Sequence, residues 1–289
     1  MPVSVPVLYR YFGRTGVKVS AVGMGTYYDF RWITVASLFG FRLRRAQIVR
    51  AIRAGIDAGI NLIDTAEFYK SEALVAEAVK GYDREKLFIA TKVFPTHLKF
   101  GKVIRSCEKS LRRLELDYID LYQIHFPRQG IPLSETMGAM EKLVDEGKIR
   151  HIGISNFSLD KMREAENGLK KYTLASTQMH YNMMHRDVEK EILPHCAENG
   201  IALMAYFPVA HGKLAKPAGG EAHSALESVR KKYGLATTAQ VGLNYLISKS
   251  ENVFPIPRAS TQEHVLQNAE LGGNLFSDED MAVLAGLFG

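Results

Sequence analysis

The sequence is poor in cysteine, which excludes a protein stabilised by a disulfide framework. Its 289 residues include two cysteines, Cys107 and Cys196, and both fall in segments predicted to be helical. Small secreted proteins that depend on disulfides carry many more cysteines at regular spacing. Neither cysteine has a second Cys or His at the spacing of a metal site. We therefore expect a protein of the reducing cytoplasm with no structural metal.

Long apolar runs and flexible linkers are also missing. No run of apolar residues reaches the roughly 20 residues that cross a bilayer. Residues 1–7 lack the charged start and the apolar core of a signal peptide. No tract rich in Pro, Gly or Ser divides the chain. We expect no membrane segment and a single domain over residues 1–289.

The chain is moderately basic, with a net charge of +6 and a pI near 9.1. Such an excess fits nucleic-acid binding, a cationic groove for phosphate-bearing small molecules, or an ordinary solvated surface. No motif of a DNA- or RNA-binding fold occurs in the sequence. We therefore expect no nucleic-acid partner, and the solvated surface is the simplest explanation.

Strand and helix patterns alternate along the chain. A turn at residues 13–16 joins two short strands, which predicts an N-terminal β-hairpin. The strands that follow are continuous apolar runs, as in a parallel sheet covered on both faces. They are predicted at residues 22–25, 61–64, 87–92, 118–125, 149–155, 175–178, 202–206 and 253–256. Helices are predicted to begin near residues 46, 72, 101, 134, 159, 188 and 238.

Eight such units in a chain of this length predict a closed (β/α)8 TIM barrel that follows the hairpin. An open doubly wound sheet is the competing arrangement. The turn Gly23-Met24-Gly25 lacks the third glycine of a dinucleotide-binding fingerprint, which disfavours the open sheet. Residues 27–45 and 209–221 interrupt the alternation. Both segments follow strands and should lie on the face that carries function.

Polar side chains follow three successive strands, at the ends where barrels carry catalytic groups. Asp64 ends one strand and Tyr69 follows it, while Lys92 and His125 end the next two. An ammonium near a phenol lowers the pKa of the phenol, so we expect Lys92 to make Tyr69 more acidic. Asp64 would pair with Lys92, and His125 would polarise a carbonyl or relay the proton.

Each of these residues has an ordinary explanation when taken alone. The Asp fits a helix cap, the Tyr a packed aromatic, the Lys a solvated cation and the His a structural group. Together, on one face, they fit a tyrosine that protonates a carbonyl oxygen. Reduction of that carbonyl also needs a hydride, which no side chain supplies, so a nicotinamide cofactor is implied.

Several segments match the aldo-keto reductase family, which the chain resembles over nearly its full length. The matching segments are Gly25-Thr26, residues 61–69, 110–127 and 147–157, and Ile256-Pro257. The resemblance implies that Asp64, Tyr69, Lys92 and His125 form the catalytic tetrad, with Tyr69 as the general acid. It also implies NADPH as the cofactor, with NADH as the alternative.

The resemblance further implies a nicotinamide site at the ends of the later strands. Ser155, Asn156 and Gln178 match the contacts of the carboxamide, and Tyr206 matches the aromatic that stacks on the ring. The ordinary alternative for Ser155 and Asn156 is a helix cap before Leu159. For Gln178 and Tyr206 the alternatives are a polar strand end and an aromatic at the barrel top.

The phosphate and adenine end would lie around the last strand. Arg258 would bind the 2′-phosphate, and Ser260 and Thr261 precede a helix N-terminus that attracts anions. The loop 209–216 resembles the segment that folds over the pyrophosphate. The cofactor positions that the resemblance implies are Gly25, Thr26, Ser155, Asn156, Gln178, Tyr206, Phe207, Pro208, Gly212, Lys213, Ile256, Arg258, Ser260, His264, Gln267 and Asn268.

Three residues around this site depart from the family pattern. His264 stands where many NADP-dependent members have an arginine, and Ala259 lacks a hydroxyl often found there. Phe207 replaces the serine of a Tyr-Ser-Pro sequence, so one phosphate contact must come from the backbone or from elsewhere. These departures predict only a moderate preference for NADP over NAD.

The substrate pocket is the least specified part of the sequence. Tyr27 stands where the family often has a tryptophan beside the substrate, so the resemblance implies that it lines the pocket. Phe94 and His97 follow Lys92 and are also expected to line it. Residues 30–45 are apolar, aromatic and basic, and fit a lid, a contact in a homo-oligomer, or a loop without a role. The chain stops soon after Phe288, without the long C-terminal loop that narrows the pocket in steroid- and aldose-reducing relatives. The resemblance therefore implies an open site for small aldehydes, ketoaldehydes or sugar-derived carbonyls.

We therefore expect an NADP(H)-dependent enzyme that reduces aldehydes or ketones. One alternative is a cofactor-binding regulatory subunit with slow turnover. The other is a Schiff-base lyase that uses Lys92 as its nucleophile. Asp64 disfavours the lyase because it stabilises the charged form of the lysine.

Overall fold

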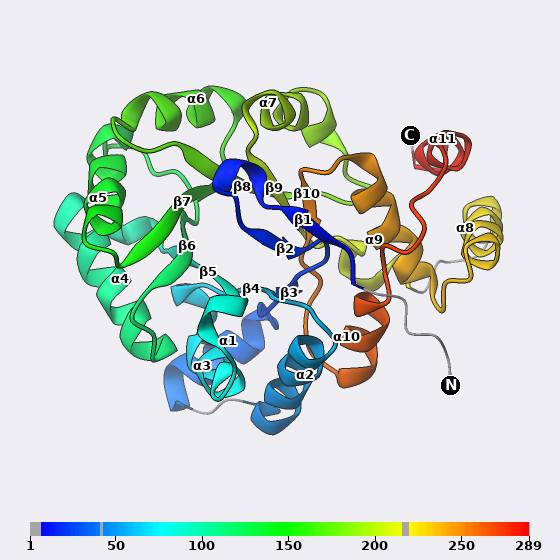
Figure 1. Ribbon diagram of the computed structural model, residues 1–289, viewed down its shortest axis with the longest axis horizontal. Helices are drawn as coiled ribbons and strands as arrows, with labels where there is room; N and C mark the ends of the chain where they lie inside the picture. The colour runs from blue at the N-terminus through cyan, green and yellow to red at the C-terminus, as the bar shows by residue number, and fades with distance from the viewer. Residues whose placement is uncertain (1–6, 41–42, 216–219, 289) are drawn as a thin grey trace.

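The computed structural model describes residues 7–40, 43–215 and 220–288, and eight parallel strands form its centre (Figure 1). Their order in the sheet follows the chain from β3 to β10. The strands are β3 (Met24–Gly25), β4 (Leu62–Asp64), β5 (Phe88–Val93), β6 (Ile119–Ile124), β7 (Ile149–Ser155), β8 (Leu174–His180), β9 (Ala202–Tyr206) and β10 (Val253–Pro255). All eight predicted strands are confirmed.

The first and last strands meet, so the sheet closes into a barrel. The amide of Gly23 donates to the Pro255 carbonyl (2.9 Å), and the amide of Ala259 donates to the Gly25 carbonyl (2.9 Å). Gly25 permits this approach, because a Cβ atom there would lie 2.7 Å from the carbonyl oxygen of Ile256. The closed (β/α)8 barrel is therefore confirmed over the open doubly wound sheet.

Helices surround the barrel on its outer face (Figure 1). Those that alternate with the strands are α2 (Arg45–Asp57), α3 (Glu72–Val79), α4 (Phe100–Leu114), α5 (Leu133–Asp145), α6 (Leu159–Gly168), α7 (Ile192–Asn199), α9 (Thr238–Lys249) and α10 (Gln262–Ala269). Cys107 in α4 and Cys196 in α7 are buried and unpaired. Two further helices, α8 (Gly220–Lys232) and α11 (Asp278–Gly286), were not predicted.

The predicted hairpin is confirmed and lies across one end of the barrel (Figure 1). Strands β1 (Tyr9–Tyr11) and β2 (Lys18–Ser20) pair antiparallel. Between them, Phe12 is fully buried, and its ring lies 4.7 Å from that of Phe88 and 5.1 Å from that of Phe254. The hairpin thus closes the end at which the strands begin.

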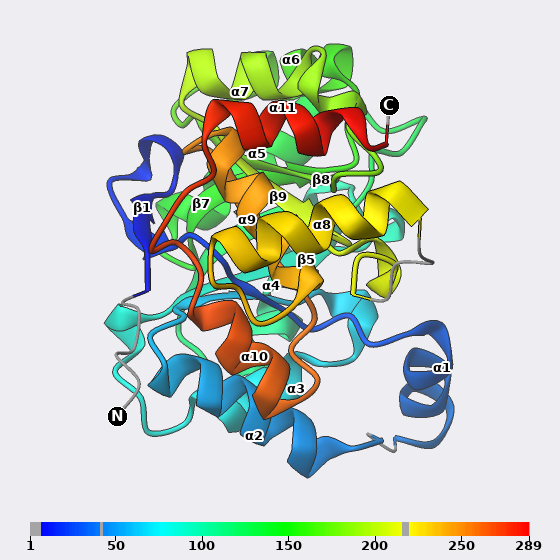
Figure 2. The same ribbon diagram turned by 90° about the vertical axis from the view of Figure 1, so that its right-hand side faces the viewer.

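Residues 27–45, for which the sequence left several roles open, contain the helix α1 (Phe30–Phe39). The side chain of Asp29 caps it by accepting from the amide of Trp32 (2.6 Å), and Gly40 ends it with a φ of 65°. Trp32 and Ile33 are buried, which anchors the helix. Figure 2 shows α1 at the end of the barrel opposite the hairpin, beyond the carboxyl ends of the strands.

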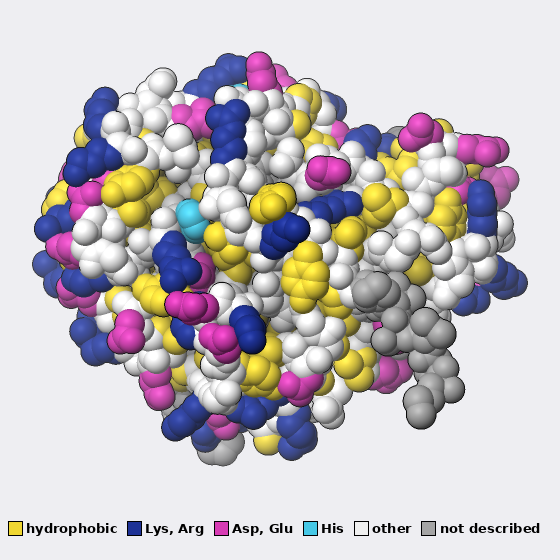
Figure 3. Space-filling model, viewed as in Figure 1, with side chains coloured by type: hydrophobic (Ala, Val, Ile, Leu, Met, Phe, Trp, Pro, Cys, Tyr) yellow, Lys and Arg dark blue, Asp and Glu magenta, His cyan; other side chains and the backbone are white. Residues whose placement is uncertain are grey.

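The surface around the hairpin carries both signs of charge. Figure 3 shows Lys and Arg side chains interspersed with Asp and Glu on this face, rather than one basic patch. The helices in the described parts of the chain are all too short or too polar to cross a membrane.

Candidate active site

The carboxyl ends of β4, β5 and β6 bring the four residues of the predicted tetrad together. Asp64 is the last residue of β4, Lys92 lies in β5, and His125 directly follows β6. Tyr69 ends the short 3-10 helix η2 (Glu67–Tyr69), which begins soon after β4. The curvature of the barrel turns all four side chains toward one mouth, as strand-end spacing predicted.

Lys92 and Asp64 form a buried ion pair at the base of this group. The Lys92 ammonium donates to Oδ1 (2.9 Å) and Oδ2 (2.7 Å) of Asp64, and to the carbonyl of Thr65 (2.8 Å). Lys92 is fully buried, and its burial lowers the pKa of the ammonium while Asp64 opposes that effect. All three N–H donors of Lys92 are used, so the predicted pairing is confirmed.

Tyr69 and His125 lie above the ion pair. The Tyr69 hydroxyl is 3.4 Å from Nε2 of His125, and the Lys92 ammonium is 4.7 Å from the centre of the Tyr69 ring. Burial, with a smaller effect of Lys92, lowers the pKa of His125 to about 3. His125 is therefore neutral at physiological pH. Its Nδ1 is buried and accepts or donates no hydrogen bond among the described residues.

The expectation that Lys92 lowers the pKa of Tyr69 is wrong. Burial raises the pKa of Tyr69 well above its ordinary value, and the negative charge of Asp64 adds to the effect. The reason is that Asp64 compensates the charge of Lys92, while the phenol itself is removed from water. Tyr69 thus keeps its proton and is available as a donor rather than as a phenolate.

Two amides that the sequence did not assign to the tetrad also bind Asp64. Gln178 donates from Nε2 to Oδ1 of Asp64 (2.9 Å), across the interior of the barrel. Gln123 makes a longer contact to the same oxygen (3.4 Å). Gln178 was predicted only as a carboxamide contact. Because its NH2 group faces Asp64, its oxygen remains available for a ligand.

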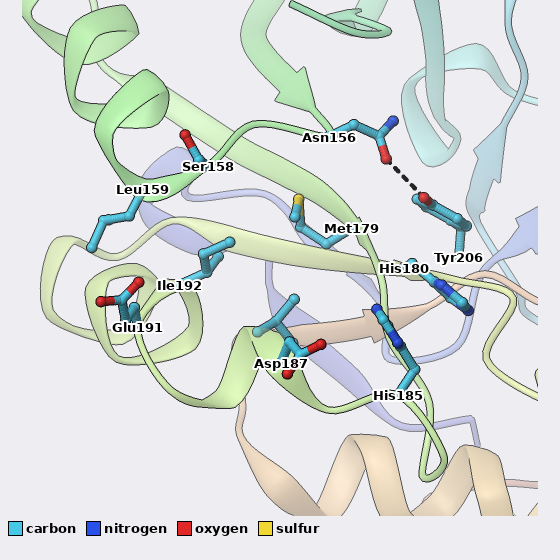
Figure 4. A pocket seen from close by; sticks show the side chains of 11 residues that line it. Asn156, Ser158, Leu159, Met179, His180, His185, Asp187, Glu191, Ile192 and Tyr206 are labelled. Atoms are coloured by element: carbon cyan, nitrogen blue, oxygen red, sulfur yellow. Dashed lines mark hydrogen bonds between the residues drawn. The ribbon is translucent and has the colours of Figure 1, made fainter.

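The predicted nicotinamide residues lie together beside the tetrad. The Ser155 hydroxyl donates to the carbonyl of Gln178 (2.9 Å), and Asn156 donates to the carbonyl of His125 (3.0 Å). The Tyr206 hydroxyl donates to Oδ1 of Asn156 (2.7 Å) (Figure 4). Ser155 and Asn156 do not cap α6, since Ser158 occupies that position. This excludes the ordinary explanation of the pair.

An array of imidazoles flanks Tyr206, and sequence reasoning missed it. The ring of His180 stacks on Tyr206 (5.5 Å) on one side and on His185 (4.2 Å) on the other. A cavity of about 270 Å³ adjoins these side chains, with Leu159, Met179 and Ile192 among its apolar lining (Figure 4). Side chains alternate between the two faces of β8, and His180 follows Gln178 by two residues, so both lie on the same face of the strand. This spacing could have identified His180 from the sequence.

The predicted phosphate residues surround the end of β10 and the start of α10. Arg258 is exposed and donates from Nη1 to the carbonyl of Tyr28 (2.7 Å). Thr261 caps α10 by accepting from the amide of His264 (3.3 Å), while the Ser260 carbonyl accepts from Gln47 (2.9 Å). Gln267 and Asn268 are half-buried along α10 and the His264 side chain is exposed.

The loop after β9 has an unusual backbone. Phe207, Ala210 and His211 all adopt positive φ values, of 51°, 48° and 55°, and Gly212 has a φ of 86°. The amides of Ala210, Gly212 and Lys213 donate to the carbonyls of Phe207, Val209 and Ala210 (3.0, 2.9 and 3.1 Å), which holds the loop in a tight turn. Lys213 is exposed on the same loop, Pro208 is buried, and Lys216 lies outside the described residues.

Aromatic rings form the wall around the Tyr69–His125 pair. Tyr27 lies edge-on to Tyr69 (5.2 Å), as predicted for a pocket residue. Phe94 stacks on Phe68 (5.0 Å), and Phe126 stacks on His125 (5.0 Å). Phe68 and Phe126 were not predicted, although each is adjacent in sequence to a tetrad residue.

His97, the third predicted pocket residue, has a different environment. Its Nδ1 lies 2.6 Å from a carboxylate oxygen of Glu67 and 3.1 Å from the hydroxyl of Ser106. It thereby joins the loop after β5 to the η2 helix that carries Tyr69. These contacts brace the loops around the pocket and do not reach the tetrad.

Comparisons with known proteins agree with this geometry. The family model described as Aldo/keto reductase family matches residues 35–287. The chain belongs to the aldo-keto reductase family. A methylglyoxal reductase of Escherichia coli (strain K12) is 37% identical over 272 residues, which span 93% of this chain and 90% of that one.

Solved structures of other aldo-keto reductases share the barrel. A thermostable aldo-keto reductase in complex with the inhibitor epalrestat superposes with a TM-score of 0.85 at 36% identity, over 97% of this chain and 99% of that one. An aldo-keto reductase of Klebsiella pneumoniae, in complex with NADPH, gives a TM-score of 0.84 at 36% identity, over 99% and 95% of the two chains. The chain is thus a carbonyl-reducing oxidoreductase by family.

Proposed function

We propose that the protein reduces small aldehydes and ketoaldehydes to alcohols with NADPH, and that Tyr69 is the general acid. The observation that carries this proposal is the Tyr69–His125 pair, in which both groups are neutral and 3.4 Å apart above the Lys92–Asp64 ion pair. A protonated phenol at the mouth of the barrel, beside a second neutral hydrogen-bonding group, suits protonation of a carbonyl oxygen.

The residues along the barrel mouth fit NADPH. The oxygen of Gln178 offers an acceptor for a carboxamide, because its NH2 group is bound to Asp64. Ser155 and Asn156 are held beside it by their bonds to the carbonyls of Gln178 and His125. One face of the Tyr206 ring stacks on His180, which leaves the other face for the nicotinamide. The exposed ammonium of Lys213 on the loop after β9 suits a pyrophosphate, and the exposed guanidinium of Arg258 suits a 2′-phosphate.

Each member of the tetrad has a distinct role in this reaction. When bound, the nicotinamide supplies a hydride to the carbonyl carbon. Tyr69 donates its proton to the carbonyl oxygen, and His125 orients that oxygen by a hydrogen bond. The Lys92 ammonium, 4.7 Å from the centre of the Tyr69 ring, offsets part of the cost of the negative charge left on Tyr69, although burial and Asp64 keep the pKa of Tyr69 above its ordinary value. Asp64 keeps Lys92 protonated and in place. A high pKa of Tyr69 suits this step, because the oxygen that receives the proton is itself becoming a strongly basic alkoxide.

The wall of the pocket supports small or flat carbonyl substrates without charge. Tyr27, Phe68, Phe94 and Phe126 supply apolar rings, and the sequence similarity to a methylglyoxal reductase points to a ketoaldehyde. We infer methylglyoxal and other small aldehydes as the substrates to test first.

The test is a fluorescence titration with NADPH and NADH, followed by a carbonyl panel that monitors NADPH consumption. Saturable binding of NADPH and turnover of methylglyoxal are expected. Binding without turnover of any carbonyl would favour the regulatory-subunit alternative. Absence of nucleotide binding would overturn the proposal.

The Schiff-base lyase is disfavoured by the contacts of Lys92. A lysine nucleophile needs a free lone pair, whereas all three donors of this ammonium are bound to Asp64 and Thr65. We expect no covalent adduct when substrate and borohydride are added. Trapping of Lys92 in that experiment would reverse the assignment.

A further inference from the structure

A short segment connects the coenzyme end of the site to the tetrad. Gly25 bonds to the chain just after β10, where its carbonyl accepts from the Ala259 amide (2.9 Å). Thr26 bonds to the end of β4, since its amide (3.0 Å) and its hydroxyl (2.9 Å) both donate to the Asp64 carbonyl. Residues 25 and 26 therefore tie the predicted phosphate site to a tetrad residue.

Tyr28 continues this segment and makes two contacts with the chain after β10. Its hydroxyl donates to the carbonyl of Ala259 (3.2 Å), and its carbonyl accepts from Nη1 of Arg258 (2.7 Å). The Tyr28 ring is 6% exposed and packs against Trp32 (5.3 Å). Burial raises the pKa of Tyr28, so its hydroxyl remains a donor at all relevant pH values.

Arg258 gains a fixed direction from Tyr28. In the part of the chain that the structure describes, the bond to the Tyr28 carbonyl is the one hydrogen bond of this guanidinium, and no carboxylate pairs with it. An arginine has five N–H donors in a rigid plane, so four remain after this bond. Because the plane is rigid, holding Nη1 also orients the other donors and reduces the rotamer entropy lost on binding a phosphate.

We propose that Tyr28 is a positioning residue for coenzyme choice, which holds Arg258 and Ala259 so that the guanidinium meets the 2′-phosphate of NADPH. This inference rests on the proposed function, in which Arg258 binds that phosphate. A lysine at position 258 could not keep the carbonyl bond and present a planar pair of donors at once. Tyr28 thus contributes to selectivity without touching the coenzyme.

The test compares the dissociation constants of NADPH and NADH for Tyr28→Phe and Tyr28→Leu. Tyr28→Phe keeps the ring and removes the bond to Ala259, and should weaken NADPH binding by about two- to three-fold. Tyr28→Leu also removes the aromatic packing that places the carbonyl, and should weaken it by about five-fold or more. NADH binding should change by less than about two-fold in both variants.

Tyr245→Phe is a matched control. Tyr245 is also fully buried, and its hydroxyl donates to Glu189 rather than to a residue of the coenzyme site. It should leave the ratio of NADPH to NADH affinity unchanged. Thermal unfolding reports whether each variant is folded, and Tyr28→Phe remains informative if Tyr28→Leu is not folded.

A double-mutant cycle with Arg258→Ala separates the two proposals. If Tyr28 acts through Arg258, adding Tyr28→Phe or Tyr28→Leu to Arg258→Ala should not reduce the NADPH preference further. Additive losses, or equal losses for NADPH and NADH, would overturn the role of Tyr28. If Arg258→Ala itself leaves the preference unchanged, the phosphate assignment fails instead. If only Arg258→Ala reduces it, that assignment stands and the role of Tyr28 is wrong.

Discussion

The hydroxyl group of Tyr69 lies 3.4 Å from Nε2 of His125, and both groups are neutral. The Tyr69 hydroxyl thus carries a proton at the mouth of the barrel, and neither Tyr69 nor His125 bears a charge. Beneath it, all three N–H donors of Lys92 are bound to Asp64 and to the carbonyl of Thr65. Lys92 therefore has no proton free for a ligand, whereas the Tyr69 phenol keeps its proton.

Replacement of this proton donor gives the first prediction. Tyr69→Phe should lower kcat for methylglyoxal by about 10²- to 10⁴-fold, the usual contribution of a positioned general acid. The NADPH dissociation constant should stay nearly constant because the ring is retained. Steady-state kinetics and the fluorescence titration measure the two quantities. A mild loss of kcat would remove Tyr69 as the acid.

The low pKa of His125 predicts a pH dependence of stability. The pKa of His125 is about 3 in the folded protein, and its ordinary value is 6.5. Between these two pH values His125 binds a proton in the unfolded chain but not in the folded protein. The resulting stability is fully present above pH 6.5 and is lost as the pH falls toward 3. Between pH 7 and pH 5 this loss should be about 2 kcal/mol.

His125→Gln isolates that contribution from other titrating groups. Urea unfolding measures the free energy of unfolding of both proteins at pH 7 and pH 5. From pH 7 to pH 5 this free energy should fall by about 2 kcal/mol more in the wild type than in the variant. Equal falls in the two proteins would mean that His125 is not held neutral in the folded state.

The fold was largely predictable because its signals are local. Each barrel strand is a buried apolar run, and the hairpin has a turn sequence of its own. Helix α1 was missed although Asp29 and Gly40 are ordinary signals for its two ends. Its apolar and aromatic residues were interpreted as a lid, an oligomer contact or a loop without a role instead. Helix α11 likewise begins with the cap Ser277 and an acidic first turn, a local signal that was overlooked.

The site was predictable only as a set of positions. Strand ends identify Asp64, Lys92 and His125, but the partners of these groups come from across the barrel. The amide of Gln178 reaches Asp64 from a residue 114 positions away, and Arg258 bonds to Tyr28 over 230 positions. The pKa of Tyr69 depends on burial, which spacing in the sequence does not reveal. For that reason the predicted direction of the pKa shift of Tyr69 was wrong.

The two amides on Asp64 should differ in their contribution to stability. Gln178 makes a 2.9 Å hydrogen bond to the carboxylate, so Gln178→Met should cost about 1.5–3 kcal/mol of unfolding free energy. Gln123 makes a 3.4 Å contact, and its own oxygen is buried without a partner among the described residues. Gln123→Met removes that unsatisfied atom, so its cost should be below about 1 kcal/mol. Urea unfolding compares the variants, and the reverse order would contradict the geometry.

Helix α1 extends the aromatic wall, which predicts a role in substrate choice. The ring of Phe30 lies edge-on to Phe68 (6.1 Å), and Phe68 in turn lies 6.5 Å from His125. Phe30→Ala should raise KM for an aromatic aldehyde several-fold, since an aromatic contact is worth about 0.5–1.5 kcal/mol. KM for methylglyoxal should change little, because that substrate is too small to reach from His125 to α1.

Phe39→Ala is the matched control for this prediction. Phe39 ends the same helix and is 76% exposed, and its ring makes no aromatic contact in the described part of the chain. Deletion of the whole helix is a poorer test, because it would also remove the buried Trp32 and Ile33. If both alanine variants alter KM equally, the effect belongs to the helix as a whole. If neither variant alters it, α1 does not line the site, and its exposed apolar residues, Phe30, Leu38 and Phe39, must be explained by a contact outside the active site.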